Sequence, residues 1–221
     1  MKHAITGSDD ELVLPHGRNW FSRAVDDPAR IYYWPIVGRL YRKRVLACLK
    51  HCTGGDKILE IGFGSGVTFL TLGKKYGEIH GVDLHAPVNR LQDLFRSQGV
   101  NCLLRNGSAL ALPYPDEYFD TVLLISILEH LTPGDVRLAS REIRRVLKRG
   151  QPVVYGVPVE RPLMRLAFFL LGYNIRKHHF STETQVSEAM REVFVDGRIE
   201  TLSSPFGPIY QVGKFWTPPP S

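Results

Sequence analysis

The feature that most constrains the fold is a glycine-rich stretch, KILEIGFGSGVT, that runs from residue 57 to residue 68. An apolar run carries the acid Glu60 near its end, and glycines follow at alternate positions, 62, 64 and 66. Glycine admits positive φ and lets a backbone approach a ligand closely. The pattern therefore predicts a buried strand, a tight turn and a helix whose first N–H groups face a ligand. An ordinary glycine-rich strand–helix turn is the alternative.

Composition sets the outer limits. A chain of 221 residues, 43% hydrophobic and 23% charged, is typical of one globular domain with a buried core. Its three cysteines, Cys48, Cys52 and Cys102, fit neither a disulfide framework nor zinc-ligand spacing, so we expect a reducing compartment and no metal. The first fifteen residues lack the apolar core of a signal peptide, and no apolar run is long enough to span a bilayer. The sequence predicts a cytoplasmic protein.

The net charge of +6 is concentrated in one region. Between Arg137 and Lys177, ten Lys and Arg residues stand against two acids. Such a basic face attracts phosphate, anionic lipid or nucleic acid, and a solvated helix surface is the equal alternative.

Apolar runs and helical patterns alternate along the chain. We expect strands at 57–61, 78–83, 100–104, 119–126 and 153–157, and helices at 41–49, 67–75, 87–97 and 135–148. A helix through Val193 and strands at 198–202 and 209–216 follow. This alternation predicts an α/β fold with a doubly wound, mostly parallel sheet, whose ligands bind at the carboxyl ends of the strands.

The chain divides into two predicted parts. Residues 1–52 form an N-terminal tail and a lid-like helical lead-in, and residues 53–217 form the main domain. Within that domain, 161–180 is an apolar and basic insert that is suited to lie at an interface. Peripheral membrane contact through 161–177, packing on the sheet and a dimer contact all stay open, as does the oligomeric state.

The register of the glycines excludes two common ligands. A dinucleotide fingerprint needs Gly-x-Gly-x-x-Gly, but Val67 or Phe69 stands at the third glycine position. A phosphate-binding P-loop needs Gly-Lys-Ser/Thr, which is missing. What remains is acid-x-Gly-x-Gly-x-Gly, with Asp83 seventeen residues past Gly66.

In combination with four later segments, this motif resembles the class I S-adenosylmethionine-dependent methyltransferases, in the small-molecule branch that includes ubiquinone and menaquinone methylases. The segments that carry the resemblance are Leu59–Gly66, Gly81–Asp83, Gly107–Tyr114, Phe119–Leu131 and Arg145–Gly150. The resemblance implies a Rossmann-like, three-layer α/β/α fold with a seven-stranded sheet and an antiparallel last strand.

S-adenosyl-L-methionine is the cofactor that the resemblance implies. Its expected binding residues are Glu60, Gly62, Phe63, Gly64, Gly66, Asp83, Leu84, Ser108, Ala109, Ile125 and Ser126. Asp83 matches the acid that binds the ribose hydroxyls. The chain departs from the family pattern at Ser108, where the family has an adenine-binding Asp, and at Phe63, where Cys or Ala is commoner.

The expected reaction is methyl transfer to a small or lipid-like acceptor, with oxygen slightly preferred. The cofactor carries the difficult chemistry, and a base is needed only if the acceptor atom starts protonated. His179 and His130 are the candidate bases, because histidine titrates near neutral pH; a structural role for His130 is the alternative. Nucleic acid is not an expected partner, because strand four lacks an Asn-Pro-Pro-Tyr or Pro-Cys element. A non-catalytic protein of the same fold, acting as a cofactor-binding or interaction module, is the competing hypothesis.

Overall fold

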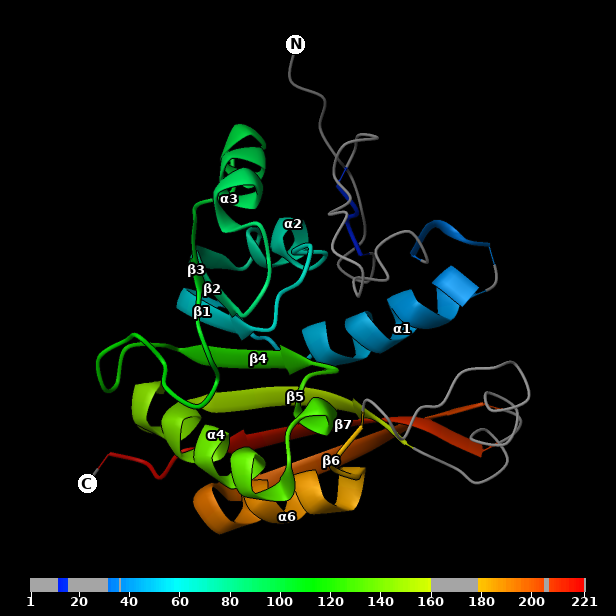
Figure 1. Cartoon of the computed structure of the whole chain (residues 1–221), viewed down its shortest axis with the longest axis vertical. Coiled ribbons are helices and arrows are strands. Elements are labelled where there is room, and N and C mark those ends of the chain that lie inside the picture. The colour runs from blue at the N-terminus through cyan, green and yellow to red at the C-terminus, as the bar shows by residue number, and fades with distance from the viewer. Residues whose placement is uncertain (1–11, 16–31, 36, 160–178, 205–206, 221) are drawn as a thin grey trace.

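The computed structural model describes residues 12–15, 32–35, 37–159, 179–204 and 207–220 (Figure 1). Most of the predicted N-terminal tail and of the 161–180 insert lies outside the described residues, so the membrane and interface hypotheses for that insert stay predictions.

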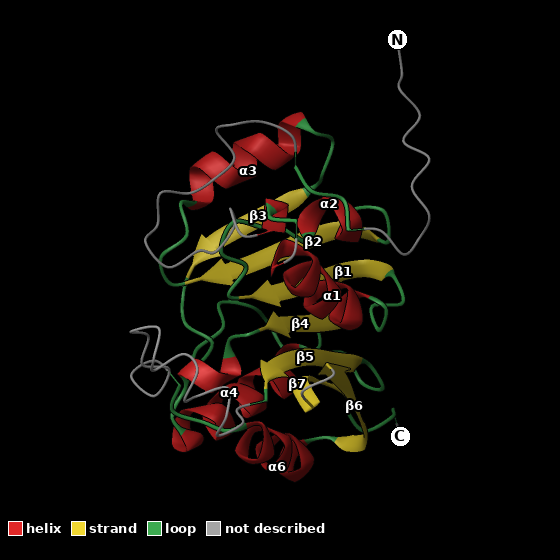
Figure 2. Cartoon of the chain, turned by 90° about the vertical axis from the view of Figure 1, so that its right-hand side faces the viewer, coloured by secondary structure: helices red, strands yellow, loops and turns green. Residues whose placement is uncertain are grey.

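The core of the molecule is a seven-stranded sheet with the order β3-β2-β1-β4-β5-β7-β6, which can be followed from top to bottom in Figure 2. The strands are β1 (Gly55–Ile61), β2 (Tyr76–Asp83), β3 (Cys102–Asn106), β4 (Thr121–Ile125), β5 (Pro152–Pro158), β6 (Val195–Ser204) and β7 (Gly207–Trp216). The first five pair in parallel, whereas β7 runs antiparallel to both of its neighbours. The predicted mostly parallel sheet with an antiparallel last strand is confirmed.

Helices cover both faces of the sheet because alternate residues of the central strands point to opposite sides. Ile58 and Leu123 share one apolar cluster with residues of α1 (Val37–Leu49), α2 (Phe69–Leu72) and α3 (Val88–Ser97). Leu59 and Leu124 share the other with residues of α4 (Pro133–Val146) and α6 (Glu183–Val193). The three-layer α/β/α arrangement is confirmed.

Several boundaries differ from the sequence prediction. The helix expected at 67–75 is only α2, because residues 64–68 and 73–75 form turns. On both sides of α2 the backbone makes i→i−3 hydrogen bonds, from the Phe69 N–H to the Gly66 carbonyl at 3.1 Å and from the Lys75 N–H to the Leu72 carbonyl at 2.8 Å, where an α-helix makes i→i−4 bonds. In contrast, α4 begins two residues earlier than expected, because Thr132 caps it and Pro133 occupies its first position. None of the described helices combines the length and the apolar character needed to cross a membrane.

Candidate active site

The carboxyl ends of three adjacent strands bring the predicted site residues to one edge of the sheet. β1 lies between β2 and β4, so the turn after Ile61, Asp83 at the end of β2 and Ser126 after β4 are neighbours. The strand order reverses direction between β1 and β4, and a doubly wound sheet opens its binding crevice at such a point.

The glycine turn is built so that only glycine fits. Gly62, Gly64 and Gly66 have φ values of 70°, 52° and 69°, in the left-handed region that side chains rarely adopt. A Cβ at Gly62 would lie 2.1 Å from the Ile127 side chain, and one at Gly66 would lie 2.7 Å from the ring of Phe95. The segment after β4 therefore packs directly on the turn after β1.

Asp83 connects that turn to the loop after β2. Its Oδ2 accepts the Gly64 N–H at 3.0 Å, and its Oδ1 accepts the N–H groups of His85 and Ala86 at 2.8 and 2.9 Å. A carboxylate offers about four lone-pair positions. Oδ2 therefore has a lone pair left to accept a hydrogen bond from a ligand hydroxyl, while the carboxylate also holds the turn in place.

Glu60 is a buried acid at the base of the turn, with 3% of its surface exposed. The Thr68 hydroxyl donates to its Oε2, so within the described residues a side chain, and not a turn N–H, partners this carboxyl. Burial raises the pKa of Glu60 to about 8; the nearby Asp83 charge adds to the rise and the Thr68 hydrogen bond opposes it. A cationic group placed beside Glu60 would favour its ionised form.

The remaining predicted cofactor residues are arranged unevenly. Leu84 is 62% exposed next to Asp83, whereas the Phe63 side chain is buried and packs on Phe69, with ring centroids 5.5 Å apart. The core takes up the bulk of Phe63, so only its backbone can face a ligand. The Gly107 N–H donates to the Asp83 carbonyl at 3.0 Å, which keeps the loop of Ser108 and Ala109 beside the end of β2.

Ser126 joins two residues that sequence reasoning missed, Arg44 from α1 and Tyr210 from β7. Its Oγ lies 3.0 Å from the Tyr210 hydroxyl and accepts a hydrogen bond of 3.2 Å from Arg44. The Arg44 guanidinium lies over the Tyr210 and Tyr41 rings, 4.4 and 5.1 Å from their centroids. Ser126 itself has a φ of 56°, and strained backbone of this kind clusters at functional sites. Arg44 has no ion pair with any described acid.

The two candidate bases lie together. The rings of His130, in the short helix η2 (Leu128–His130), and His179 are 5.1 Å apart between centroids. The N–H of Phe180 donates to the Glu129 carbonyl at 2.8 Å, so the chain that returns at residue 179 is fixed on η2. Ligand atoms of Glu129, His130 and His179 lie within 4.8 Å of one another, a spacing that would also admit a metal ion. The sequence prediction of no metal stays a prediction.

Comparison with known proteins shows what the domain around this site is similar to. Residues 58–150 match the methyltransferase-domain family. The chain is 35% identical over 100 residues to the uncharacterized methyltransferase YcgJ of Bacillus subtilis, which covers 44% of this chain and 39% of that protein. It is 30% identical over 139 residues to the ubiquinone/menaquinone biosynthesis C-methyltransferase UbiE of Vibrio cholerae, which covers 59% of this chain and 52% of the relative. The chain thus spans about half or less of these relatives' length.

A solved structure shares the fold. Phosphoethanolamine N-methyltransferase 2 of Haemonchus contortus, in complex with S-adenosyl-L-methionine, superposes with a TM-score of 0.64 at 16% identity. The match covers 80% of this chain and 52% of that protein. At this level of identity the likeness establishes the fold alone.

Proposed function

We propose that this chain transfers a methyl group from S-adenosyl-L-methionine to a small or lipid-like acceptor, preferably to oxygen. The match of residues 58–150 to a methyltransferase-domain family supports this proposal. The observation that carries the proposal is the edge where the turn of left-handed glycines meets buried Glu60, Asp83 and Ser126. When bound, the cofactor supplies a methyl group already activated on a sulfonium.

Each part of this edge has a proposed binding role. Glu60 favours the cationic amino end of the cofactor, and Asp83 accepts a ribose hydroxyl through the open position on Oδ2. The remaining proposed contacts come from the turn, the end of β4 and the loops after β2, β3 and β4, through Gly62, Phe63, Gly64, Gly66, Leu84, Ser108, Ala109, Ile125 and Ser126.

Proton removal from an acceptor hydroxyl is assigned to His179, with His130 as the second candidate. His130 lies in η2, directly after the segment whose Ile127 packs on Gly62, and the ring of His179 lies beside that of His130. Of the two, His130 is on the chain that continues from β4, and His179 comes from the segment before α6 that is hydrogen-bonded to η2. A base within hydrogen-bond reach of the acceptor typically contributes about 10²–10⁴-fold to the rate.

Arg44 is the proposed contact for an anionic part of the acceptor. Its aromatic neighbours, Tyr41 and Tyr210, hold the guanidinium in one orientation, and its hydrogen bond to Ser126 uses one of its five donors. A partly buried cation with no ion pair among the described acids suits a carboxylate or phosphate group.

The cofactor half of the proposal is tested by calorimetry with S-adenosylmethionine and S-adenosylhomocysteine. We expect binding of both, and absence of heat at millimolar ligand contradicts the proposal. The catalytic half is tested by incubation with phenols, quinols and lipids, with mass spectrometry of the methylated product. Binding without any product across the panel favours the non-catalytic hypothesis.

The base assignment needs matched variants. His179→Ala and His130→Ala are compared with His51→Ala, which removes a histidine that pairs with Glu200 away from this edge. We expect a fall in kcat for the first two with unchanged cofactor affinity. Chelator treatment of the wild type separates a base from a metal site, because only the metal site loses activity.

A further inference from the structure

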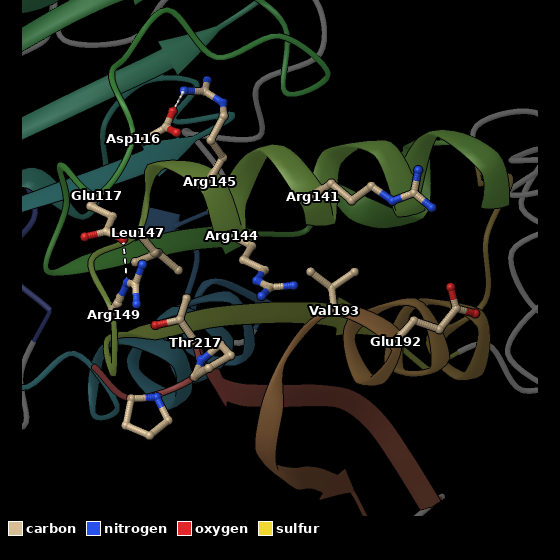
Figure 3. Close-up of a pocket in the computed structure, with 12 residues that line it drawn as sticks. Asp116, Glu117, Arg141, Arg144, Arg145, Leu147, Arg149, Glu192, Val193 and Thr217 are labelled. Atoms are coloured by element: carbon tan, nitrogen blue, oxygen red, sulfur yellow. Dashed lines mark hydrogen bonds and ion pairs between the residues drawn. The ribbon is translucent and has the colours of Figure 1, made fainter. Parts of the chain in front are cut away.

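A cavity of about 600 Å³, whose lining residues are drawn in Figure 3, is separate from the proposed methyl-transfer edge. It is enclosed by the second half of α4, the loop before β4, the end of α6 and the segment after β7. Its lining residues are Asp116, Glu117, Arg141, Arg144, Arg145, Leu147, Arg149, Glu192, Val193, Thr217, Pro218 and Pro219.

This cavity is at the amino edge of the parallel strands. Asp116 and Glu117 precede the start of β4, and Thr217 follows the end of the antiparallel strand β7. The proposed methyl-transfer site is at the carboxyl edge of the same strands. A seven-residue strand such as β1 spans about 20 Å, so the two sites are separated by roughly the length of a strand.

The charges in the cavity do not balance. Arg145 pairs with Asp116 at 2.8 Å, and Arg149 pairs with Glu117 at 2.8 Å. The third acid, Glu192, is held at 3.0 Å by Arg137, which lies outside the lining. All three acids are thus occupied, whereas Arg141 and Arg144 form no ion pair with any described residue.

The two remaining arginines occupy neighbouring positions on one helix. Arg141 and Arg144 are three residues apart on α4, a spacing that places them on the same face. Figure 3 shows Arg144 extending from α4 into the space between Val193 and Thr217, whereas the Arg141 side chain runs along α4 away from Arg144. A planar guanidinium group can donate two parallel hydrogen bonds to two oxygens of one phosphate, a geometry that a lysine cannot offer. Beside the arginines, Leu147, Val193 and two prolines form an apolar wall.

We propose that this cavity is a binding site for a phosphorylated small molecule with an apolar or aromatic ring, in which Arg144 holds the phosphate and Arg141 adds positive charge at the rim. The volume is within the range of small-molecule sites, and the apolar wall accommodates the ring. The basic segment that the sequence shows from Arg137 onward thereby contributes two arginines to a defined site, separate from the methyl-transfer edge.

The test is calorimetry of the full chain with phenyl phosphate, inorganic phosphate and phenol. We expect phenyl phosphate to bind most tightly, inorganic phosphate more weakly and phenol not measurably. The variant Arg141→Gln/Arg144→Gln should lose about tenfold or more in phenyl phosphate affinity, because the charge-assisted contact of Arg144 and the positive charge of Arg141 are both lost. Arg96→Gln, which removes an exposed arginine on α3, is the control and should bind like the wild type.

Three outcomes overturn the proposal. The first is the absence of phenyl phosphate binding to the wild type at millimolar ligand, which leaves the arginines as a solvated helix surface. The second is an equal loss in Arg96→Gln, which indicates a general charge effect. The third is competition between phenyl phosphate and S-adenosylhomocysteine, which places the phosphate at the carboxyl edge. Arg141 and Arg144 are both distant from the carboxyl edge. The affinity of the double variant for S-adenosylhomocysteine should therefore stay unchanged, which reports that the variant is correctly folded.

Discussion

At the scale of single residues, Glu60 couples stability to pH. Its pKa is raised by burial to about 8 in the folded chain, whereas an unfolded glutamate titrates near 4.3. The folded state therefore holds a proton that the unfolded state releases, so the free energy of unfolding of the ligand-free protein falls as pH rises between those two values. The Glu60→Gln variant has no ionisable group at this position, so this fall in the free energy of unfolding is absent. We expect the variant to be more stable than the wild type by a few kcal/mol (order of magnitude) above pH 8, and the gap to close near pH 5.

Urea denaturation at several pH values measures that gap. Glu188→Gln, which neutralises an exposed acid on α6, is the matched control and should show no pH-dependent gain. A wild type whose stability does not fall across this window would contradict the buried, protonated Glu60.

The same variant should lose cofactor affinity. A cationic group beside Glu60 stabilises the carboxylate, so binding below pH 8 should release a proton. Calorimetry in two buffers of different ionisation enthalpy counts that proton. We expect Glu60→Gln to bind S-adenosylmethionine about tenfold or more weakly and to release fewer protons, because a charge-assisted contact is lost. Unchanged affinity together with unchanged proton release would remove Glu60 from the cofactor site.

Arg44 separates acceptor binding from cofactor binding. For an acceptor with a carboxylate or phosphate, Arg44→Gln should raise KM about tenfold or more and leave the affinity for S-adenosylhomocysteine unchanged. Arg39→Gln, an exposed position on the same helix, is the control. A weaker affinity for S-adenosylhomocysteine in the Arg44 variant instead assigns this side chain to the carboxylate of the cofactor.

At the scale of elements, the start of α6 holds the returning chain in position. Thr182 and Gln185 form a reciprocal capping box, and the Ser181 hydroxyl donates to the Leu131 carbonyl at 2.6 Å. Thr182→Ala should cost about 1 kcal/mol of unfolding free energy, as loss of an N-cap usually does. Thr184→Ala, an exposed position in the first turn of the same helix, serves as the control in urea denaturation. Equal losses in the two variants would exclude a specific role for the cap.

The elements differ in how far their sequence predicts them. The strand at β4 was predictable because it is apolar on both faces, and α6 because its cap residues precede a helical pattern. The helix after the glycine turn was predicted too long, since apolar spacing does not reveal where the backbone changes from i→i−4 to i→i−3 hydrogen bonds. Tyr210 reaches Ser126 because β7 inserts between β5 and β6, and Arg44 reaches it from α1, which packs on one face of the sheet. No local pattern encodes either contact.

At the scale of the whole molecule, two proposed ligand sites lie at opposite ends of the same strands, about one strand length apart. A ligand that binds only the folded state raises the free energy of unfolding by about 2.7 kcal/mol when present at 100 times its Kd. Effects at sites more than about 10 Å apart with no shared partners usually add within about 0.5 kcal/mol. The carboxyl-edge and amino-edge sites meet that condition across a strand such as β1, which is about 20 Å long.

We therefore expect S-adenosylhomocysteine and phenyl phosphate to stabilise the protein additively. Unfolding free energies with each ligand alone and with both, all at the same fixed ligand concentrations, measure the sum directly. In Arg141→Gln/Arg144→Gln only the phosphate increment should shrink, and in Glu60→Gln only the cofactor increment. A combined effect that exceeds or falls short of the sum by more than about 1 kcal/mol is a coupling free energy between the edges. That result would mean that the strands transmit binding at one edge to the other, and it would replace two independent sites with a regulated one.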